Sequence, residues 1–308
     1  MDLRHLRYFL CVAEEMHFGR AALRLGISQP PLSQQIRSLE EELGVRLFDR
    51  TSRRVSLTEA GRLFAPEARA TIAQAERAAQ TARLAQMGQI GHLSLGFTAS
   101  GPFVPRLARA LYQFRQSFPN VTLNLQELGR DGQIDAVERG HMDVAIVRCF
   151  DQPVLPDGLV PLQLVEEEMF LAIRQDHRLA RQPRNPAIDD LKDEPLVLYG
   201  AVAGAGFNEH FLAMCEQAGF RPNIAQEAGS LATLLGLVAA GFGATILARS
   251  LTRLHVDNLT YRSFATPVKS RLWLIHRKIL SPTAHAFKET ILTAEDGWEP
   301  SPSAVLSG

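Results

Sequence analysis

Hydrophobic and polar positions follow three successive patterns along the chain. Residues 1–57 contain several short helical patterns, and residues 58–87 form one long alanine-rich stretch. From His92 onward, runs typical of buried strands alternate with helical patterns. The predicted strands are 92–97, 121–128, 143–148, 169–174, 196–199, 244–249 and 271–276. This alternation predicts an α/β fold with mainly parallel sheets, in a section of roughly 210 residues that is long enough for two small lobes.

A helix-turn-helix pattern lies within residues 18–44, FGRAALRLGISQPPLSQQIRSLEEELG. Gly26 can adopt the left-handed conformation that ends a helix, and we expect a second helix to begin after Ser28 as its N-cap. Pro30 and Pro31 then fall in the first turn, where a missing backbone N–H removes no intrahelical bond. A helical hairpin with an arginine-rich solvated face is the alternative explanation of this pattern.

The second helix of this pattern has two distinct faces. Its apolar side chains recur at spacings of four, three and four residues and are expected to face the core: Leu32, Ile36, Leu39 and Leu43. On the opposite face, towards the N-terminus, polar side chains can reach base edges or phosphates in a major groove: Gln29, Ser33, Gln34 and Arg37. Two short β-type runs around a turn follow, in a segment that carries Arg46, Arg50, Arg53 and Arg54. We interpret this segment as a basic wing that meets the DNA backbone or the minor groove.

Composition and charge are those of a soluble globular protein, and only the first 90 residues carry a charge excess that bears on function. The 308 residues are 46% hydrophobic and 21% charged, which argues against extended disorder. Lys+Arg 33 balances Asp+Glu 33, so the charge of the whole chain indicates neither a nucleic-acid nor a membrane partner. Residues 1–90 carry 13 arginines, no lysine and 10 acidic residues, a net charge of +3. Arginine suits phosphates and guanine edges better than lysine, although a GC-rich genome explains the same usage.

Cysteine usage and hydropathy favour a cytoplasmic location. Cys11, Cys149 and Cys215 form no C-x-x-C pair and are too few for a disulfide framework, so we expect buried thiols in a reducing compartment. The first residues lack the apolar core of a signal peptide, and no run approaches the ~20 apolar residues that span a bilayer. The nearest run, 231–248, is broken by three glycines, which predicts a buried helix, a turn and a buried strand. No membrane partner is expected.

Residues that can hold a small molecule follow the predicted strands. In α/β sheets, ligands bind beyond the carboxyl ends of strands. These positions hold hydroxyl groups, two arginines and the start of a helix: Thr98, Ser100, Gly101, Arg130, Arg148, Phe207 and Asn208. Guanidinium and backbone N–H groups bind carboxylates, so we predict a small organic anion as ligand, covered by Phe207. Helix capping by the hydroxyl groups, pairing of the arginines with Asp131 or Asp151, and a core position for Phe207 remain as alternatives.

Enzyme chemistry finds no support in the sequence. It contains no G-x-S-x-G, H-E-x-x-H or Walker motif, and its nine histidines show no metal-ligand spacing. The string GAGFNE has Glu209 where a dinucleotide fingerprint has its third glycine. We therefore expect no catalytic residue, no metal site and no cofactor.

Two sections of the chain resemble the LysR-type transcriptional regulators. An almost unbroken match over residues 3–64 includes LRHLRYFLCVAEE and SQPPLSQQIRSLEEELGVRLFDRTSRRVSLTEAGRLF. The strings FRQSFPNV, GHMDVAIV and LGLVAAGFGATIL are similar to the effector-binding region of that family. The resemblance, which is closest to regulators of aromatic-compound catabolism, implies three parts. These are an all-α winged helix-turn-helix DNA-binding domain (1–57), a dimerising linker helix (58–90) and a two-lobed, periplasmic-binding-protein-like α/β effector domain (91–300). The composition of the last residues, WEPSPSAVLSG, predicts a disordered tail (301–308).

The resemblance also implies roles for individual residues. The recognition helix would begin with Gln29, Pro30, Pro31, Ser33 and Gln34, and the wing tip would hold Arg53 and Arg54. Many members of the family have a basic residue where this chain has Gln34. A glutamine at this position would weaken a phosphate or guanine contact and would permit bidentate pairing to adenine instead. Ser100 and Arg148 would lie in the effector cleft, where Arg130 replaces a frequent small hydroxyl residue.

The partners implied are double-stranded operator DNA and a small organic-anion effector, either an aromatic acid or a muconate-like diacid. RNA polymerase is a further expected partner. Two other functions stay open at this point. One is a thiol-based redox sensor of the same family, which would use Cys149 and Cys215. The other is a solute-binding receptor, although such a protein needs a signal peptide and has no use for residues 1–87.

The alanine-rich stretch fits the linker helix of the family. About 29 residues from Glu59 to Met87 would extend roughly 43 Å. Its narrow apolar contacts are consistent with antiparallel pairing in a homodimer: Leu63, Ile72, Ala75, Ala79, Ala82 and Met87. Pairing of dimers into a homotetramer is implied by the resemblance. Pro66 is expected to kink this helix or to mark its start. An amphipathic helix packed on its own domain is the alternative.

Overall fold

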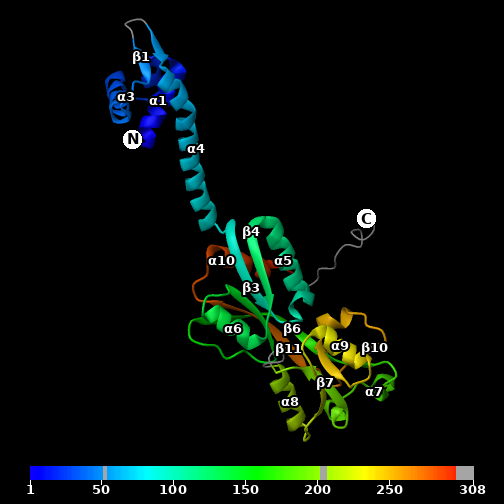
Figure 1. Cartoon of the computed structure of the whole chain (residues 1–308). Coiled ribbons are helices and arrows are strands. Elements are labelled where there is room, and N and C mark those ends of the chain that lie inside the picture. The colour runs from blue at the N-terminus through cyan, green and yellow to red at the C-terminus, as the bar shows by residue number, and fades with distance from the viewer. Residues whose placement is uncertain (51–53, 202–206, 296–308) are drawn as a thin grey trace. The chain divides into compact units, whose positions relative to one another are not determined.

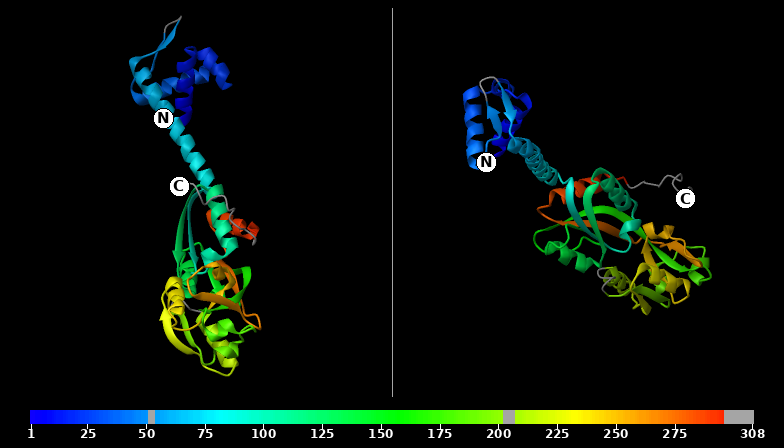
Figure 2. Two further views of the ribbon diagram at one scale, coloured as in Figure 1. Left: turned by 90° about the vertical axis from the view of Figure 1, so that its right-hand side faces the viewer. Right: turned by 45° about the horizontal axis from the view of Figure 1, so that its top comes forward.

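The structure is a computed structural model that describes residues 1–50, 54–201 and 207–295. The chain divides into two compact units, Met1–Leu84 and Ala85–Gly308. The first unit is mainly helical with one small hairpin, and the second combines helices with two sheets. Figure 1 labels these elements, and Figure 2 shows each unit from two further sides.

The first unit consists of short helices, a two-stranded hairpin and most of one long helix: α1 (Leu3–Glu15), α2 (Phe18–Leu25), α3 (Gln29–Leu43), β1 (Phe48–Arg50), β2 (Val55–Leu57) and α4 (Glu59–Gln86). Phe9, Leu32 and Phe48 meet in one apolar cluster to which all of the helices contribute. Gly26 has a φ of +69° and ends α2, as the sequence predicts. The predicted helix-turn-helix and the two wing strands are therefore present.

The long helix α4 begins at Glu59 and continues through Pro66, so Pro66 does not mark its start. The side of α4 that carries Ala65 and Ala68 is buried in the apolar cluster of the first unit, and Ile72 packs partly against the same cluster. Leu63 is 65% exposed on another side of the helix. The N-terminal half of α4 thus packs on its own domain and still leaves apolar side chains uncovered.

The second unit has two lobes that share two long strands. The first lobe contains β3 (Ile90–Phe97), η1 (Gly101–Phe103), α5 (Pro105–Ser117), β4 (Asn120–Glu127), α6 (Arg130–Glu138), β5 (Val144–Cys149) and α10 (Pro282–Thr293). The second lobe contains α7 (Arg178–Arg181), η2 (Ile188–Leu191), β7 (Pro195–Tyr199), α8 (Phe207–Gln217), β8 (Asn223–Ala228), α9 (Leu231–Ala239), β9 (Thr245–Ala248), η3 (Arg249–Arg253) and β10 (Leu259–Ser263). The strands β6 (Leu159–Arg174) and β11 (Lys269–Arg277) connect the lobes.

The prediction of mainly parallel sheets is wrong. The larger sheet has the order β10-β6-β11-β5-β3-β4, with β9 also paired to β6, and β7 pairs with β8 separately. Among the described pairs of the second unit, β3 runs parallel to β4 and β5, and β7 runs parallel to β8. The pairs that involve β6 or β11 are antiparallel. The reason is that β6 leads the chain out of the first lobe and β11 brings it back beside β6.

The positions of most strands agree with the sequence pattern. The predicted strands at 92–97, 121–128, 143–148, 196–199, 244–249 and 271–276 overlap β3, β4, β5, β7, β9 and β11. However, β6 begins at Leu159, well before the predicted 169–174. The sequence pattern misses the first part of this strand because Pro161 and three consecutive glutamates interrupt its apolar positions. The strands β8 and β10 escape prediction, since most of their side chains are polar or partly exposed.

Candidate DNA-binding surface and effector cavity

The helix α3 presents the predicted polar side chains at its N-terminal end. Leu32, Ile36 and Leu39 are fully buried against the rest of the first unit and fix the orientation of the helix. Ser28 precedes α3 in an extended conformation, and Pro30 and Pro31 occupy the first turn. The predicted DNA-contacting residues of this helix are exposed or half-buried: Gln29, Pro30, Pro31, Ser33, Gln34 and Arg37. They therefore lie together on one accessible end of the helix.

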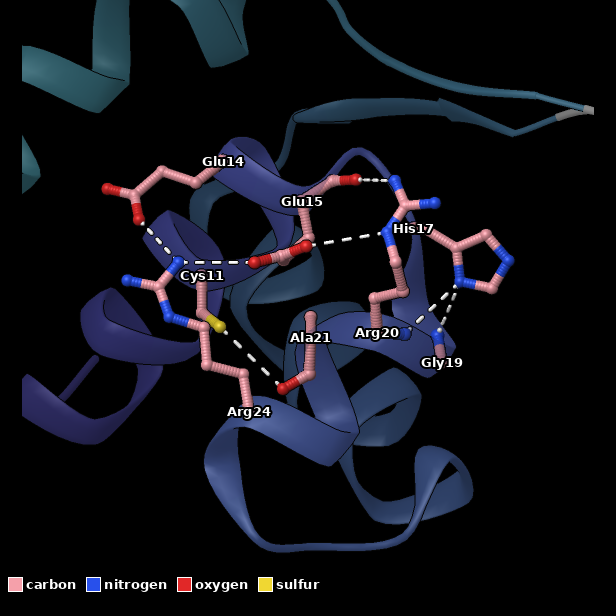
Figure 3. A network of polar contacts seen from close by, with 8 residues as sticks. All are labelled: Cys11, Glu14, Glu15, His17, Gly19, Arg20, Ala21 and Arg24. Carbon is pink, nitrogen blue, oxygen red and sulfur yellow. Dashed lines mark hydrogen bonds and ion pairs between the residues drawn. The ribbon is translucent and has the colours of Figure 1, made fainter.

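The polar contacts in Figure 3 join α1, α2 and the turn between them. His17 caps α2, because its Nδ1 accepts hydrogen bonds from the backbone N–H groups of Gly19 at 3.0 Å and Arg20 at 3.2 Å. Arg24 of α2 donates to Glu14 at 2.9 Å and pairs with Glu15 of α1 at 3.3 Å. These contacts join α2 to α1, and both helices pack with α3 in the same apolar cluster.

The predicted wing is a short antiparallel hairpin in which Phe48 faces Leu57 and Arg50 faces Val55. Arg54 is exposed, whereas Arg53 lies outside the described residues. Arg50 is engaged in the fold rather than presented to a ligand. It donates to Glu40 of α3 at 2.7 Å, and its guanidinium lies 4.8 Å above the ring of Phe18.

Glu40 links α3 to the predicted wing. Its Oε1 accepts hydrogen bonds from the backbone N–H groups of Leu47 at 2.8 Å and Phe48 at 3.0 Å, and its Oε2 binds Arg50. The Glu40 side chain is 12% exposed, so these charge-assisted bonds are partly shielded from water. Sequence analysis missed this residue because a glutamate in the run EEE of a helix normally faces solvent.

A cavity of about 490 Å³ lies between the two lobes of the second unit. Its described lining comes from the ends of strands in both lobes and is mostly apolar: Thr98, Ala99, Ser100, Glu127, Leu128, Gly129, Arg148, Tyr199, Gly200, Ala201, Phe207, Gly229, Ser230, Ile246, Leu247, Ala248 and Leu251. Four of the residues predicted for the effector site are brought together here: Thr98, Ser100, Arg148 and Phe207. The Thr98 Oγ1 is buried and has no hydrogen-bond partner among the described residues.

Three other predicted residues are placed elsewhere. Arg130 lines a separate cavity of about 290 Å³ and pairs with its neighbour Asp131 at 2.7 Å, which agrees with the alternative explanation. Gly101 is buried in η1, where an added Cβ would lie 3.1 Å from the Cβ of Phe97. Asn208 donates from Nδ2 to the backbone carbonyl of Tyr199 at 2.7 Å.

Arg148 is the centre of a buried polar network. Its guanidinium donates to Ser100 Oγ at 2.9 Å, Ser270 Oγ at 3.0 Å and Glu167 Oε2 at 2.5 Å. Glu167 also accepts hydrogen bonds from the backbone N–H of Ser250 at 3.0 Å and from its hydroxyl at 3.2 Å. Burial lowers the pKa of Arg148, and the charge of Glu167 opposes this shift. The network runs from the first lobe, through β6, to the second lobe.

Glu167, Ser250, Ser270 and Glu127 were missed by sequence analysis. Glu167 is the middle residue of the string EEE, and the antiparallel pairing of β6 with β11 is what turns it inward. Arg148 pairs with this residue and not with Asp151, the partner that the sequence suggested. A buried strand that ends in a cation was the one available signal that an acidic partner had to exist.

The thiols offer little basis for redox sensing. Cys149 and Cys215 are buried in different apolar clusters. Burial raises the pKa of each thiol to about 11, and Arg130 opposes this shift at Cys149. Because the thiolate is the reactive form, both positions favour the inert thiol.

The part of the chain that the structure describes contains no group of three or more His, Cys, Asp or Glu side chains that could hold a metal ion. No helix in the same residues is long and apolar enough to cross a membrane.

The chain is similar to known regulators along almost its full length. Residues 3–62 match the family described as bacterial regulatory helix-turn-helix protein, lysR family, and residues 87–296 match the LysR substrate binding domain. The HTH-type transcriptional regulator YnfL of Escherichia coli (strain K12) is 38% identical over 297 residues, which cover 96% of this chain and 99% of that protein. AlsR of Bacillus subtilis (strain 168) is 38% identical over 278 residues, which cover 89% of each chain.

Solved structures agree with this relationship. CbnR, a LysR family transcriptional regulator, is 29% identical and superimposes with a TM-score of 0.78, covering 94% of this chain and 100% of that chain. Full-length CbnR complexed with the target DNA superimposes with a TM-score of 0.79 at 28% identity, covering 94% and 98% of the two chains. The homologues are transcriptional regulators and not enzymes. This chain therefore belongs to the LysR family of DNA-binding transcriptional regulators and has the substrate-binding domain of that family.

Proposed function

We propose that this regulator binds operator DNA through α3 and the wing, and that a small organic acid in the cavity between the lobes modulates this binding. The observation that carries the proposal is the hydrogen-bonded chain from Ser100 through Arg148 and Glu167 to Ser250 beside the cavity. A ligand that binds Ser100 or Arg148 interacts directly with contacts between the lobes. Its affinity therefore differs between lobe arrangements, which is the requirement for coupling.

The lining of the cavity supports a ligand with an acidic group and an apolar body. The hydroxyls of Thr98 and Ser100 and the guanidinium of Arg148 can donate hydrogen bonds to a carboxylate. Phe207 and Leu251 supply an apolar surface, and a volume of about 490 Å³ lies within the usual range for small-molecule sites. An aromatic acid or a muconate-like diacid is the class that the family resemblance suggests.

The proposed assembly is a homodimer through α4, with dimers pairing into a homotetramer. Leu63 of α4 is 65% exposed, Met87 directly after the end of α4 is 55% exposed, and Ala79 and Ala82 are exposed between them. A second α4 would cover these side chains, and exposed apolar stripes on helices commonly serve this purpose. We place the assembly in the cytoplasm, where it would meet DNA and RNA polymerase.

The experiment is a selection of duplexes from a random-sequence library with the full-length chain, followed by anisotropy titrations of a selected and a scrambled duplex. Selective binding is expected, and benzoate or cis,cis-muconate is expected to change its affinity. Equal binding of both duplexes would contradict the DNA-binding assignment. Selective binding that neither acid alters, together with an unchanged melting temperature, would contradict these acids as effectors.

A further inference from the structure

The charges around the effector cavity differ from those of a simple anion site. In the described lining, the ionisable side chains are Glu127, Arg148 and Tyr199. Arg148 is already neutralised by Glu167, whose carboxylate lies within hydrogen-bond distance of its guanidinium. The second arginine expected at this site, Arg130, lines another cavity and is paired with Asp131. The charge that remains uncompensated in this lining is therefore negative and belongs to Glu127.

Glu127 is positioned by the sheet. It is the last residue of β4 and lies opposite Phe97 of β3, at the carboxyl end of both parallel strands. Its side chain is exposed to the cavity and to solvent, and it forms no ion pair or hydrogen bond with any residue that the structure describes. Residues 202–206, which follow the lining residue Ala201 in the chain, have the sequence VAGAG and contain no cationic side chain.

The remaining polar groups favour an acidic group elsewhere in the cavity. Ser230 is the N-cap of α9, so the partial positive charge of that helix end is directed at the lining that contains Gly229 and Ser230. Thr98 Oγ1 is buried without a partner, and Ser100 lies beside the Arg148 guanidinium. The cavity thus offers donors to a carboxylate and, separately, one carboxylate of its own.

We infer that the effector is a small zwitterionic acid, with a carboxylate for these donors and a protonated amine for Glu127, and that Glu127 selects such acids over diacids. This inference rests on the proposed function of the cavity as a site for an organic acid, and it favours a zwitterion over the muconate-like diacid that the family resemblance suggests. A diacid brings a second negative charge into an apolar cavity that already contains an unpaired carboxylate, which like-charge repulsion disfavours. An ammonium group instead gives Glu127 a charge-assisted hydrogen bond.

The test compares three acids that share one skeleton and differ in one group: phenylalanine with an ammonium, 3-phenylpropanoate with hydrogen, and benzylmalonate with a second carboxylate. A second set, leucine, 4-methylpentanoate and isobutylmalonate, covers an aliphatic skeleton. Binding to the full-length chain is measured by calorimetry. For at least one skeleton we expect the zwitterion to bind tightest, the monoacid less tightly and the diacid weakest. The dissociation constants should differ about tenfold between successive acids, which is the effect of one charged hydrogen bond at a partly exposed site.

Glu127→Gln separates the effect of charge from that of shape. It should weaken binding of the zwitterion about tenfold and strengthen binding of the diacid, so that the affinities of the three acids become similar. Glu138→Gln, an exposed residue of α6 outside the cavity lining, is the matched control and should leave the order unchanged. Any of three results overturns the inference. The first is that the diacid binds the wild-type chain as tightly as the zwitterion does, the second is that Glu127→Gln leaves the order of affinities unchanged, and the third is that none of the six acids binds. Selective DNA binding by the same preparation shows independently whether the proposed function still holds.

Discussion

The Nη2 of Arg148 lies 2.5 Å from the Oε2 of Glu167, and the two side chains are 5% and 10% exposed. Arg148 belongs to β5 of the first lobe, and Glu167 belongs to β6, which leads into the second lobe. Ser250 donates two hydrogen bonds to the same carboxylate from the second lobe. A buried charge is tolerated when its partner and its hydrogen bonds are in place, so each of these groups depends on the others.

Arg148→Ala should therefore lower the free energy of unfolding of the effector domain by about 3 to 5 kcal/mol, because it leaves the Glu167 charge buried and unpaired. Urea denaturation followed by circular dichroism measures this loss. Addition of Glu167→Gln should recover part of it, since the charge is then removed as well. Arg139→Ala, which breaks an exposed pair with Asp135, is the control and should cost at most about 0.5 kcal/mol.

Arg148→Ala should leave DNA binding without a ligand largely intact, because Arg148 lies outside the helix-turn-helix unit. A loss of less than about 1 kcal/mol in Arg148→Ala would contradict the structural role of the pair. Effector affinity in this variant is meaningful once the domain has been shown to remain folded at the temperature of the titration.

Glu40→Gln should weaken binding to every DNA sequence. The ion pair with Arg50 is lost, and the wing is then held less firmly against α3. Each phosphate contact that the wing no longer makes should reduce the slope of log K against log salt by about 1. Anisotropy titrations at several salt concentrations measure both effects.

Glu41→Gln is an informative control for this prediction, because Glu41 is exposed on the same helix. Removal of a negative charge by itself strengthens DNA binding, so Glu41→Gln should bind slightly tighter, whereas Glu40→Gln should bind more weakly. Equal changes in the two variants would show that Glu40 acts through charge alone.

The local elements could be predicted from the sequence more completely than their arrangement. The leucine and isoleucine spacing of α3, the left-handed Gly26 and the strand at Val144–Cys149 each follow from local pattern and turn chemistry. The antiparallel course of β6 beside β11 depends on how the chain returns between lobes, which local pattern does not encode. Arg148 was found because it ends a buried strand, but its partner Glu167 depends on that same long-range pairing.

Arg130, in contrast, was predicted for the effector site and lies outside it. Its position just after a strand predicted a place in the effector site, yet it begins α6 and turns to Asp131 and a second cavity. The rule that ligands bind beyond strand ends places a residue at the correct edge of a sheet. It does not determine which of two adjacent cavities the side chain enters, because that depends on the helix that follows.

All three cysteines should react slowly with iodoacetamide in the native chain at pH 8. Burial raises the pKa of Cys149 and Cys215 to about 11, so the reactive thiolate is a small fraction of each thiol at that pH and increases as the pH approaches 11. Mass spectrometry after timed alkylation, with and without urea, measures the protection. Fast modification of native Cys149 by hydrogen peroxide would instead favour a redox-sensing regulator.

Substitutions on two sides of α4 should have different consequences. Leu63→Glu places a charge at an exposed apolar position, so it should disrupt dimers while changing the melting temperature of the monomer little. Ile72→Glu should destabilise the first unit itself, because Ile72 packs against its apolar cluster. Light scattering and thermal unfolding distinguish the two effects, and a dimeric Leu63→Glu chain would place the interface elsewhere.

Two glycines in helices should respond to alanine in opposite directions. At Gly61 of α4, an added Cβ would lie 2.2 Å from the carbonyl oxygen of Leu47 and 2.9 Å from a methyl group of Leu57. The first neighbour is backbone in the segment that leads into the wing, so it cannot move without displacing β1 from α4. Gly61→Ala should therefore destabilise the first unit by about 1 to 3 kcal/mol.

At Gly132 of α6, the added Cβ meets no atom within 4 Å. Gly132→Ala should stabilise the second unit by about 0.5 to 1 kcal/mol, since alanine restricts the unfolded chain and favours the helix. Thermal unfolding of both variants, together with their DNA affinity, tests the contrast. If the wing is held by this close approach, Gly61→Ala should also weaken DNA binding, whereas Gly132→Ala should not. A Gly61→Ala chain as stable as wild type would show that α4 and the wing can separate without cost.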